Sequence, residues 1–189
     1  LTLGEQHGAA RANLLPLPSD QSIPPGRTAL HLAMYIGDVA LVRRLLAAGA
    51  DPNVRDADGV TPLQLGAGEL EADGVVAALL AAGADPNVFG AGSPSPLVRA
   101  LRLPARARVL LAAGADPNRH TVYRGLNTPL RPGTAVHAAA VLGESFLLEL
   151  MLDAYGGKVD APAADGSVPL THADGIGAYV LRARSTRSA

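Results

Sequence analysis

The chain has 189 residues, a net charge of −1, 48% hydrophobic residues and only 3% aromatic residues. This length suffices for one domain with a sizeable core or for a short array of repeats. The chain contains no Cys, which excludes disulfides, thiolate metal sites and a Cys nucleophile. It contains no run of 18 apolar residues, so the sequence predicts no membrane-spanning helix.

The charges are segregated along the chain. Residues 1–88 have a net charge of −5, residues 89–143 have a net charge of +6, and residues 144–181 again have −5. The middle stretch, here called the basic segment, holds seven Arg and a single acid, Asp116. A basic segment between two acidic ones indicates a surface that attracts an anionic partner.

The first residues do not resemble a targeting segment. The chain begins at Leu1 without an initiator Met, and it lacks the basic start and apolar run of a secretory signal peptide. We therefore expect a processed or excised piece of a longer protein. The expected location is cytoplasmic, with a nuclear location or secretion into a host cell as the alternatives.

A nine-residue motif occurs three times. Leu-Leu-Ala-Ala-Gly-Ala-Asp-Pro-Asn occupies Leu45–Asn53, Leu79–Asn87 and Leu110–Asn118, at spacings of 34 and 31 residues. The glycine of each copy fits the left-handed position after a helix, and Asp-Pro-Asn favours a turn. Repetition at this period indicates supersecondary units that stack on one another.

A second motif marks the start of a helix upstream of each copy. Thr28–Ala33 corresponds to Thr134–Ala139, and the segments that begin at Thr61, Ser95 and Val168 occupy the same slot. Thr or Ser can cap a helix, and proline is tolerated at the following position. Four alanines are expected where neighbouring helices approach closely, namely Ala33, Ala100, Ala139 and Ala173. Three glycines are expected to separate the first helix of a unit from the second, namely Gly37, Gly143 and Gly177.

Together these motifs resemble the ankyrin repeat over about residues 25–182. The resemblance implies an all-α ankyrin repeat solenoid of helix-turn-helix units with β-hairpin or loop fingers, about four repeats plus a shortened C-terminal cap. We expect the units at 25–55, 56–88, 89–119 and 120–162, the cap at 163–182 and a basic tail at 183–189. Residues 1–24 are interpreted as an N-terminal cap (a helix over Ala9–Leu15 or a degenerate repeat) or as an extended link.

Two insertions depart from the family pattern. One is rich in Asp and Glu, at Glu69–Asp73. The other lengthens a finger, because Asn118 and Thr134 are 16 residues apart whereas the corresponding distance is 8 in two other units. This finger, residues 119–133, carries three Arg, a His, a Tyr and no acid. Arg and Tyr are enriched at interface hot spots, but a tolerated surface insertion explains the same residues, since added loop length costs little entropy.

No pattern of residues indicates catalysis. His31 and His137 occupy the His slot of the family motif, where the resemblance implies a hydrogen-bonding bridge between neighbouring turns. The remaining histidines lack zinc-ligand spacing, and no nucleophile–base pair is present. We therefore expect no enzyme activity, no catalytic residues, no metal and no cofactor.

The predicted function is a protein–protein interaction module that binds a partner through the elongated basic finger (119–133) and through the concave face, which the resemblance implies is made of finger tips and first helices. We expect a monomer without a membrane association. The alternatives are the targeting part of a larger enzyme or effector, of ligase-adaptor type, or a small ankyrin-type enzyme inhibitor. The basic segment favours an acidic or phosphorylated segment of a protein and disfavours nucleic acid, while Arg stems that only cover apolar helix surface are the other interpretation. The candidate partner-binding residues are Arg27, Tyr35, Ile36, Asp58, Val60, Arg102, Arg106, Tyr123, Arg124, Arg131, Val141 and Leu142.

Overall fold

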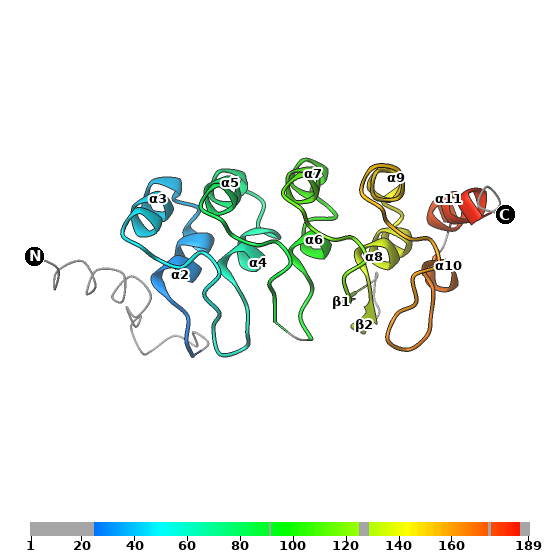
Figure 1. Cartoon of the computed structure of the whole chain (residues 1–189), viewed down its shortest axis with the longest axis horizontal. Helices are drawn as coiled ribbons and strands as arrows, with labels where there is room; N and C mark the ends of the chain where they lie inside the picture. Colours follow the sequence, from blue (N-terminus) through cyan, green and yellow to red (C-terminus); the bar gives the residue numbers. More distant parts are fainter. Residues whose placement is uncertain (1–24, 91, 125–128, 174, 186–189) are drawn as a thin grey trace, which may run out of the picture. The chain divides into compact units, whose positions relative to one another are not determined.

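The computed structural model describes residues 25–90, 92–124, 129–173 and 175–185 (Figure 1). The chain divides into two compact units, residues 1–90 and 91–189, and each unit is described by itself. The expected cap or link at 1–24 lies outside the described residues, as do the last four residues of the expected basic tail. The repeat boundaries remain a proposal.

Unit 1 contains two helix pairs. The first pair is α2 (Ala29–Ile36) and α3 (Val39–Ala47), and the second is α4 (Pro62–Gly66) and α5 (Asp73–Ala81). Helix α2 packs on α4 and α3 packs on α5, so that equivalent helices lie side by side (Figure 1). Each pair therefore covers the apolar face of its neighbour, as stacked repeats require.

Unit 2 continues the alternation of short first helices and longer second helices. Three pairs follow one another, and a two-stranded antiparallel hairpin precedes the middle pair. Helix α8 packs on α6, α9 and α10, and α9 packs on α7 and α11. The elements are α6 (Pro96–Arg99), α7 (Pro104–Ala112), β1 (Thr121–Tyr123), β2 (Arg131–Gly133), α8 (Ala135–Leu142), α9 (Ser145–Ala154), α10 (Pro169–His172) and α11 (Gly175–Ser185).

Side-chain caps are present at three of the helix starts that the motif marks. The side chains of Thr61 and Ser95 accept hydrogen bonds from the third residue of α4 and of α6, at 3.2 and 3.3 Å. Thr134 does the same at the start of α8, at 3.4 Å. Proline holds the first position of α4 and α6, where its missing N–H would have no helical partner. The motif therefore predicted the starts of these helices correctly.

The glycine predictions are confirmed except at one position. Gly37 and Gly143 end α2 and α8 in the left-handed region, with φ of 72° and 71°. The prediction that Gly177 separates two helices was wrong, because Gly177 lies inside α11. A side chain there would collide with the backbone of Ala140 in α8. Gly177 is thus required for close helix packing, and the positive φ of 53° falls two residues earlier, at Gly175.

The core is built from alanine and aliphatic side chains. Ala33, Ala100 and Ala139 are fully buried, as the motif predicted, whereas Ala173 follows the end of α10 and is half-buried. Small residues at these positions let the helix axes approach, so the stack tolerates little added volume.

Asparagine side chains connect consecutive turns inside each unit. Asn53 accepts a hydrogen bond from the N–H of Asp85 at 2.8 Å and donates one to the carbonyl of Gly83 at 3.1 Å. In unit 2, Asn118 accepts from the N–H of Lys158 at 2.8 Å and donates to the carbonyl of Gly156 at 2.8 Å. Each asparagine thus satisfies two backbone groups of the following loop, which regular secondary structure leaves unpaired.

Replacement of Asn118 by Ala should destabilise unit 2 by about 1 kcal/mol, because two solvent-accessible loop groups lose their partner. Chemical denaturation followed by circular dichroism measures the change. Arg108→Ala, at an exposed position on α7, is the control and should stay within about 0.5 kcal/mol of the unsubstituted chain. Equal midpoints for both variants would contradict the assigned role of Asn118.

Candidate functional site

Two kinds of surface were candidates for binding, the loops that precede the first helices and the ends of those helices. The loops are held by buried polar side chains. His31 of α2 accepts a hydrogen bond at Nδ1 from the N–H of Thr28, 3.2 Å away. Its Nε2 donates to the carbonyl of Val60, 2.9 Å away. The ring therefore ties the start of its own helix to the next loop, as the family resemblance implied.

This geometry suits a neutral imidazole. A carbonyl can only accept a hydrogen bond, so Nε2 carries the proton and Nδ1 is left as the acceptor for Thr28. Burial of the ring lowers the pKa of His31 below its usual value, against a smaller opposing effect of its bond to the Val60 carbonyl. A second proton, at Nδ1, would face the Thr28 N–H and break the bridge.

A buried carboxylate organises the same loop. The side chain of Asp56 is fully shielded from solvent, and its Oδ2 lies 3.2 Å from Nε of Arg27. Its Oδ1 accepts from the N–H groups of Asp58 and Val60, at 3.0 and 2.8 Å. Arg27 was a candidate contact residue, but its guanidinium is engaged in pairing this buried charge. Asp56 was not selected from the sequence, although it lies two residues before the candidate Asp58.

Equivalent bridges recur at two other first helices. In unit 2, Nδ1 of His137 accepts from the N–H of Thr134 at 3.2 Å, and Nε2 lies 3.2 Å from the carbonyl of Ser167. In unit 1, Gln64 occupies the slot and its Oε1 accepts from the N–H of Gly90 at 3.4 Å. The slot therefore serves structure, and both His and Gln can fill it.

The elongated finger forms a hairpin on an anchored base. In the register of β1 and β2, Thr121 pairs with Gly133 and Tyr123 with Arg131. Tyr123 is only 1% exposed. Its ring lies directly over Gly133, where a side chain would collide with it, and 6.2 Å from the ring of His137. Burial raises the pKa of the Tyr123 hydroxyl.

Two of the candidate contact residues in unit 2 are therefore buried, contrary to expectation. Tyr123 was expected to contact a partner, but its ring packs inside the unit and supports the finger. Arg106 is 3% exposed, on the inner face of α7, and so is not accessible to a partner either. Neither residue belongs to the binding surface proposed below.

Five other arginines of the basic segment are exposed, and Arg99 is half-buried. Arg124 follows β1 and Arg131 begins β2, so both lie in the anchored finger. Arg102 lies in the turn between α6 and α7, and Arg119 precedes the finger. The exposed arginines of unit 2 among the described residues of the basic segment are Arg102, Arg108, Arg119, Arg124 and Arg131.

The remaining candidates differ in accessibility. Ile36, at the end of α2, is 67% exposed, and Asp58 is exposed at its loop. Val60 was also a candidate contact residue, but like Tyr123 it is buried and therefore not accessible to a partner. Val141 and Leu142 are half-buried at the end of α8. The side chain of Tyr35 lies outside the described part of the structure.

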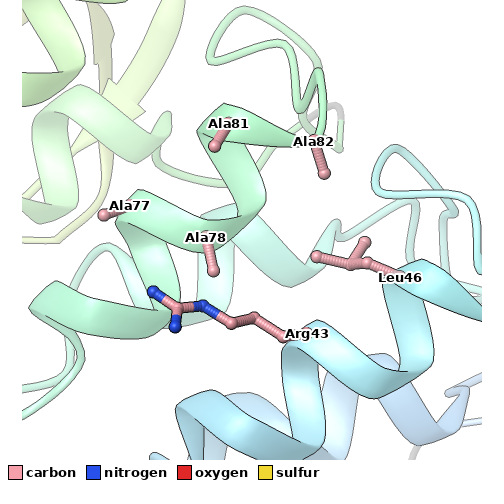
Figure 2. Close-up of a pocket in the computed structure, with 6 residues that line it drawn as sticks. All are labelled: Arg43, Leu46, Ala77, Ala78, Ala81 and Ala82. Carbon is pink, nitrogen blue, oxygen red and sulfur yellow. The ribbon is translucent and has the colours of Figure 1, made fainter.

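A first hollow in unit 1 lies between the second helices. It has a volume of about 460 Å³ and is lined by Arg43 and Leu46 of α3 and by four alanines at 77, 78, 81 and 82. Figure 2 shows Arg43 and Leu46 extending from α3 toward the alanines of α5. The hollow exists because alanine methyl groups fill less of the space between α3 and α5 than larger side chains would.

A second hollow in unit 1 lies where α2 ends and the acidic insertion begins. Its volume is about 330 Å³, and we call it the acidic hollow. Leu70, which sequence reasoning did not select, is 80% exposed beside it. The sequence feature that could have pointed to Leu70 is its place as a single aliphatic residue between Glu69 and Glu71. The lining residues are Met34, Ile36, Gly37, Glu69, Leu70, Glu71 and Ala72.

Across residues 25–90, 92–124, 129–173 and 175–185, no three His, Asp or Glu side chains are grouped so that they could hold a metal ion. Within the same ranges, none of the helices combines the length and the apolar character needed to cross a bilayer.

Comparison with known proteins identifies the repeats. A family model described as ankyrin repeats (3 copies) matches residues 7–89, a range that reaches into the segment 1–24. A stretch of 43 residues is 46% identical to the regulatory protein SWI6 of Kluyveromyces lactis. That match covers 23% of this chain and 6% of the yeast protein.

Replacement of His31 by Gln should remove part of the pH dependence of stability. Because folding lowers the pKa of His31, the unfolded chain binds this proton more tightly, and stability falls as the pH drops below about 6.5. Gln64 fills the same slot in the next helix pair of unit 1 and does not titrate. Denaturation midpoints from about pH 7.5 to about pH 5.5 should therefore fall less in His31→Gln than in the unsubstituted chain. Parallel curves would contradict the assignment.

Replacement of Tyr123 by Ala should destabilise unit 2 by about 3–5 kcal/mol, since a fully buried ring is lost. Gly133→Ala should also destabilise it, because the added methyl group collides with the same ring. Thermal unfolding measures both effects. Leu130→Ala, at an exposed position of the finger, should change the midpoint little, and a comparable loss there would show that the finger is not anchored through Tyr123.

Proposed function

We propose that this chain, whose residues 7–89 match a family model of ankyrin repeats, binds an anionic segment of a partner protein through the exposed arginines of its elongated finger. Ankyrin repeats are generally protein–protein interaction modules. The proposal adds which surface of this chain acts and what chemistry it recognises. The observation that carries it is a finger whose base is buried and whose arginines are exposed.

The anchored base favours binding because it reduces the entropy lost on association. Tyr123 packs between Gly133 and His137, and β1 pairs with β2 in a single register. The backbone that carries Arg124 and Arg131 is therefore ordered before a partner arrives. Preorganisation of this kind raises affinity without adding contacts.

The charge pattern defines the partner. Residues 119–133 contain no acid, and the basic segment as a whole has a net charge of +6. Guanidinium groups bind carboxylates and phosphates with two parallel hydrogen bonds. We therefore propose an acidic or phosphorylated protein segment as the partner, with Arg102 and Arg119 as further contact residues.

The remaining accessible candidates belong to the same proposal with smaller roles. Asp58 in unit 1, and the half-buried Val141 and Leu142 in unit 2, are proposed to contact other parts of the partner. Arg27 holds Asp56 and is proposed to act on binding only by maintaining its loop.

The double variant Arg124→Ala/Arg131→Ala tests this proposal. Point substitutions are preferable to deletion of the finger, because deletion would also remove the buried Tyr123. The variant and the unsubstituted chain are used to capture proteins from a lysate of the source organism, followed by mass spectrometry. We expect at least one protein with an acidic segment to be retained by the unsubstituted chain and lost with the variant.

A matched control removes the same charge elsewhere. Arg43→Ala/Arg44→Ala alters two exposed arginines of α3 in unit 1 and should retain the partner. Treatment of the lysate with a phosphatase separates carboxylate from phosphate recognition. Retention of every captured protein by the finger variant would overturn the proposal.

A further inference from the structure

The acidic hollow in unit 1 combines apolar surface with negative charge. Ile36 and Leu70 are 67% and 80% exposed, and both line the hollow. Exposed large apolar side chains are unremarkable singly, but two that share one depression mark a candidate interaction site. The hollow, of about 330 Å³, is of the size that can receive a large aliphatic or aromatic side chain.

The local structure explains why these side chains stay outside the core. Helix α2 ends at Gly37, whose left-handed backbone stops the helix directly after Ile36. Helix α4 is short and ends at Gly66, and the acidic insertion follows before α5 begins at Asp73. The floor is already complete, because Met34 and Ala72 are buried. Ile36 and Leu70 therefore line the hollow as exposed side chains outside the packed core.

The charge around the hollow is negative. Glu69 and Glu71 line it and are exposed. Asp38 follows Gly37 and is also exposed, with its carboxylate capping α3. Residues 56–98 contain no Lys or Arg, so the insertion has no basic neighbour in sequence. A segment that fills the hollow would bring its flanking residues against these carboxylates.

We propose that the acidic hollow binds a basic segment of a partner protein, in which one large apolar side chain inserts between Ile36 and Leu70 and flanking Arg or Lys residues face Glu69 and Glu71. Charge complementarity decides the occupant, since an acidic segment would meet like charge. This site has the opposite preference to the finger and does not depend on the finger's role.

Selection from a displayed library of random dodecapeptides tests the proposal. The full chain, Ile36→Ala/Leu70→Ala and Glu69→Gln/Glu71→Gln are each immobilised, with circular dichroism used to verify their folding. Peptides with one large apolar residue flanked by Arg or Lys should be enriched on the unsubstituted chain. Their Kd should rise about tenfold or more in the apolar variant and should lose most of its salt dependence in the Gln variant.

Controls distinguish this site from other surfaces. Val109→Ala/Phe146→Ala removes two exposed apolar side chains of unit 2 and should leave the Kd of the basic peptides unchanged. Arg124→Ala/Arg131→Ala should also leave them unchanged, while acidic peptides, if selected, should be lost with it. The two proposals can therefore fail separately.

Two kinds of outcome would overturn the inference. One concerns the peptides: either no basic peptides are selected, or the selected ones still bind Ile36→Ala/Leu70→Ala. The other is self-association in sedimentation velocity that the same variant abolishes. In that case the occupant would be a second copy of this chain, whose finger carries the exposed Leu130 next to Arg131.

Discussion

The structure depends on side chains that supply hydrogen bonds to the backbone of the following turn. Apart from the β1–β2 hairpin, the described loops between helix pairs lack regular secondary structure, yet several of their N–H and carbonyl groups bond to side chains of neighbouring residues. His31, Asn53 and Asp56 satisfy such groups in unit 1, and Asn118 and His137 do so in unit 2. Loss of such a bond leaves a backbone group without its partner, so each loop is ordered only with the neighbouring helix pair of its own unit in place.

This dependence on neighbours separates polar residues that hold the fold from polar residues that can bind. A His or Asp in a turn suggests chemistry when it is read alone. Here the imidazole of His31 and the carboxylate of Asp56 are used by the backbone, and Arg27 neutralises the carboxylate. Arg124 and Arg131 of the finger and Ile36 and Leu70 beside the acidic hollow take no part in these bridges, and their side chains are exposed.

The two proposed surfaces also differ in how they are built. The finger is an inserted hairpin whose base is fixed by an aromatic ring against a glycine, and its charge is positive. The acidic hollow arises where short helices end at glycines and an insertion carries an aliphatic side chain outward. Insertions in a repeat array change such edges with little effect on the stacked core. Opposite charge on the two surfaces favours different partner segments.

The sequence alone was sufficient for the repeat, the fold class and most helix starts, because these depend on local chemistry. A capping Thr or Ser, a proline at the first helical position and a glycine after a helix act through their immediate neighbours. The same holds for the charge segregation, which is a property of the chain order.

Only the tertiary structure decided which side chains are accessible. Tyr123 and Arg106 are residue types that are common at interfaces, but both are buried. Leu70, between two glutamates, is exposed. Gly177 matches a helix break in spacing, yet it lies inside α11 because α8 passes too close for a side chain. The exposure of a side chain and the close approach of two helices depend on contacts between residues far apart in the chain. Spacing along the sequence does not reveal these contacts.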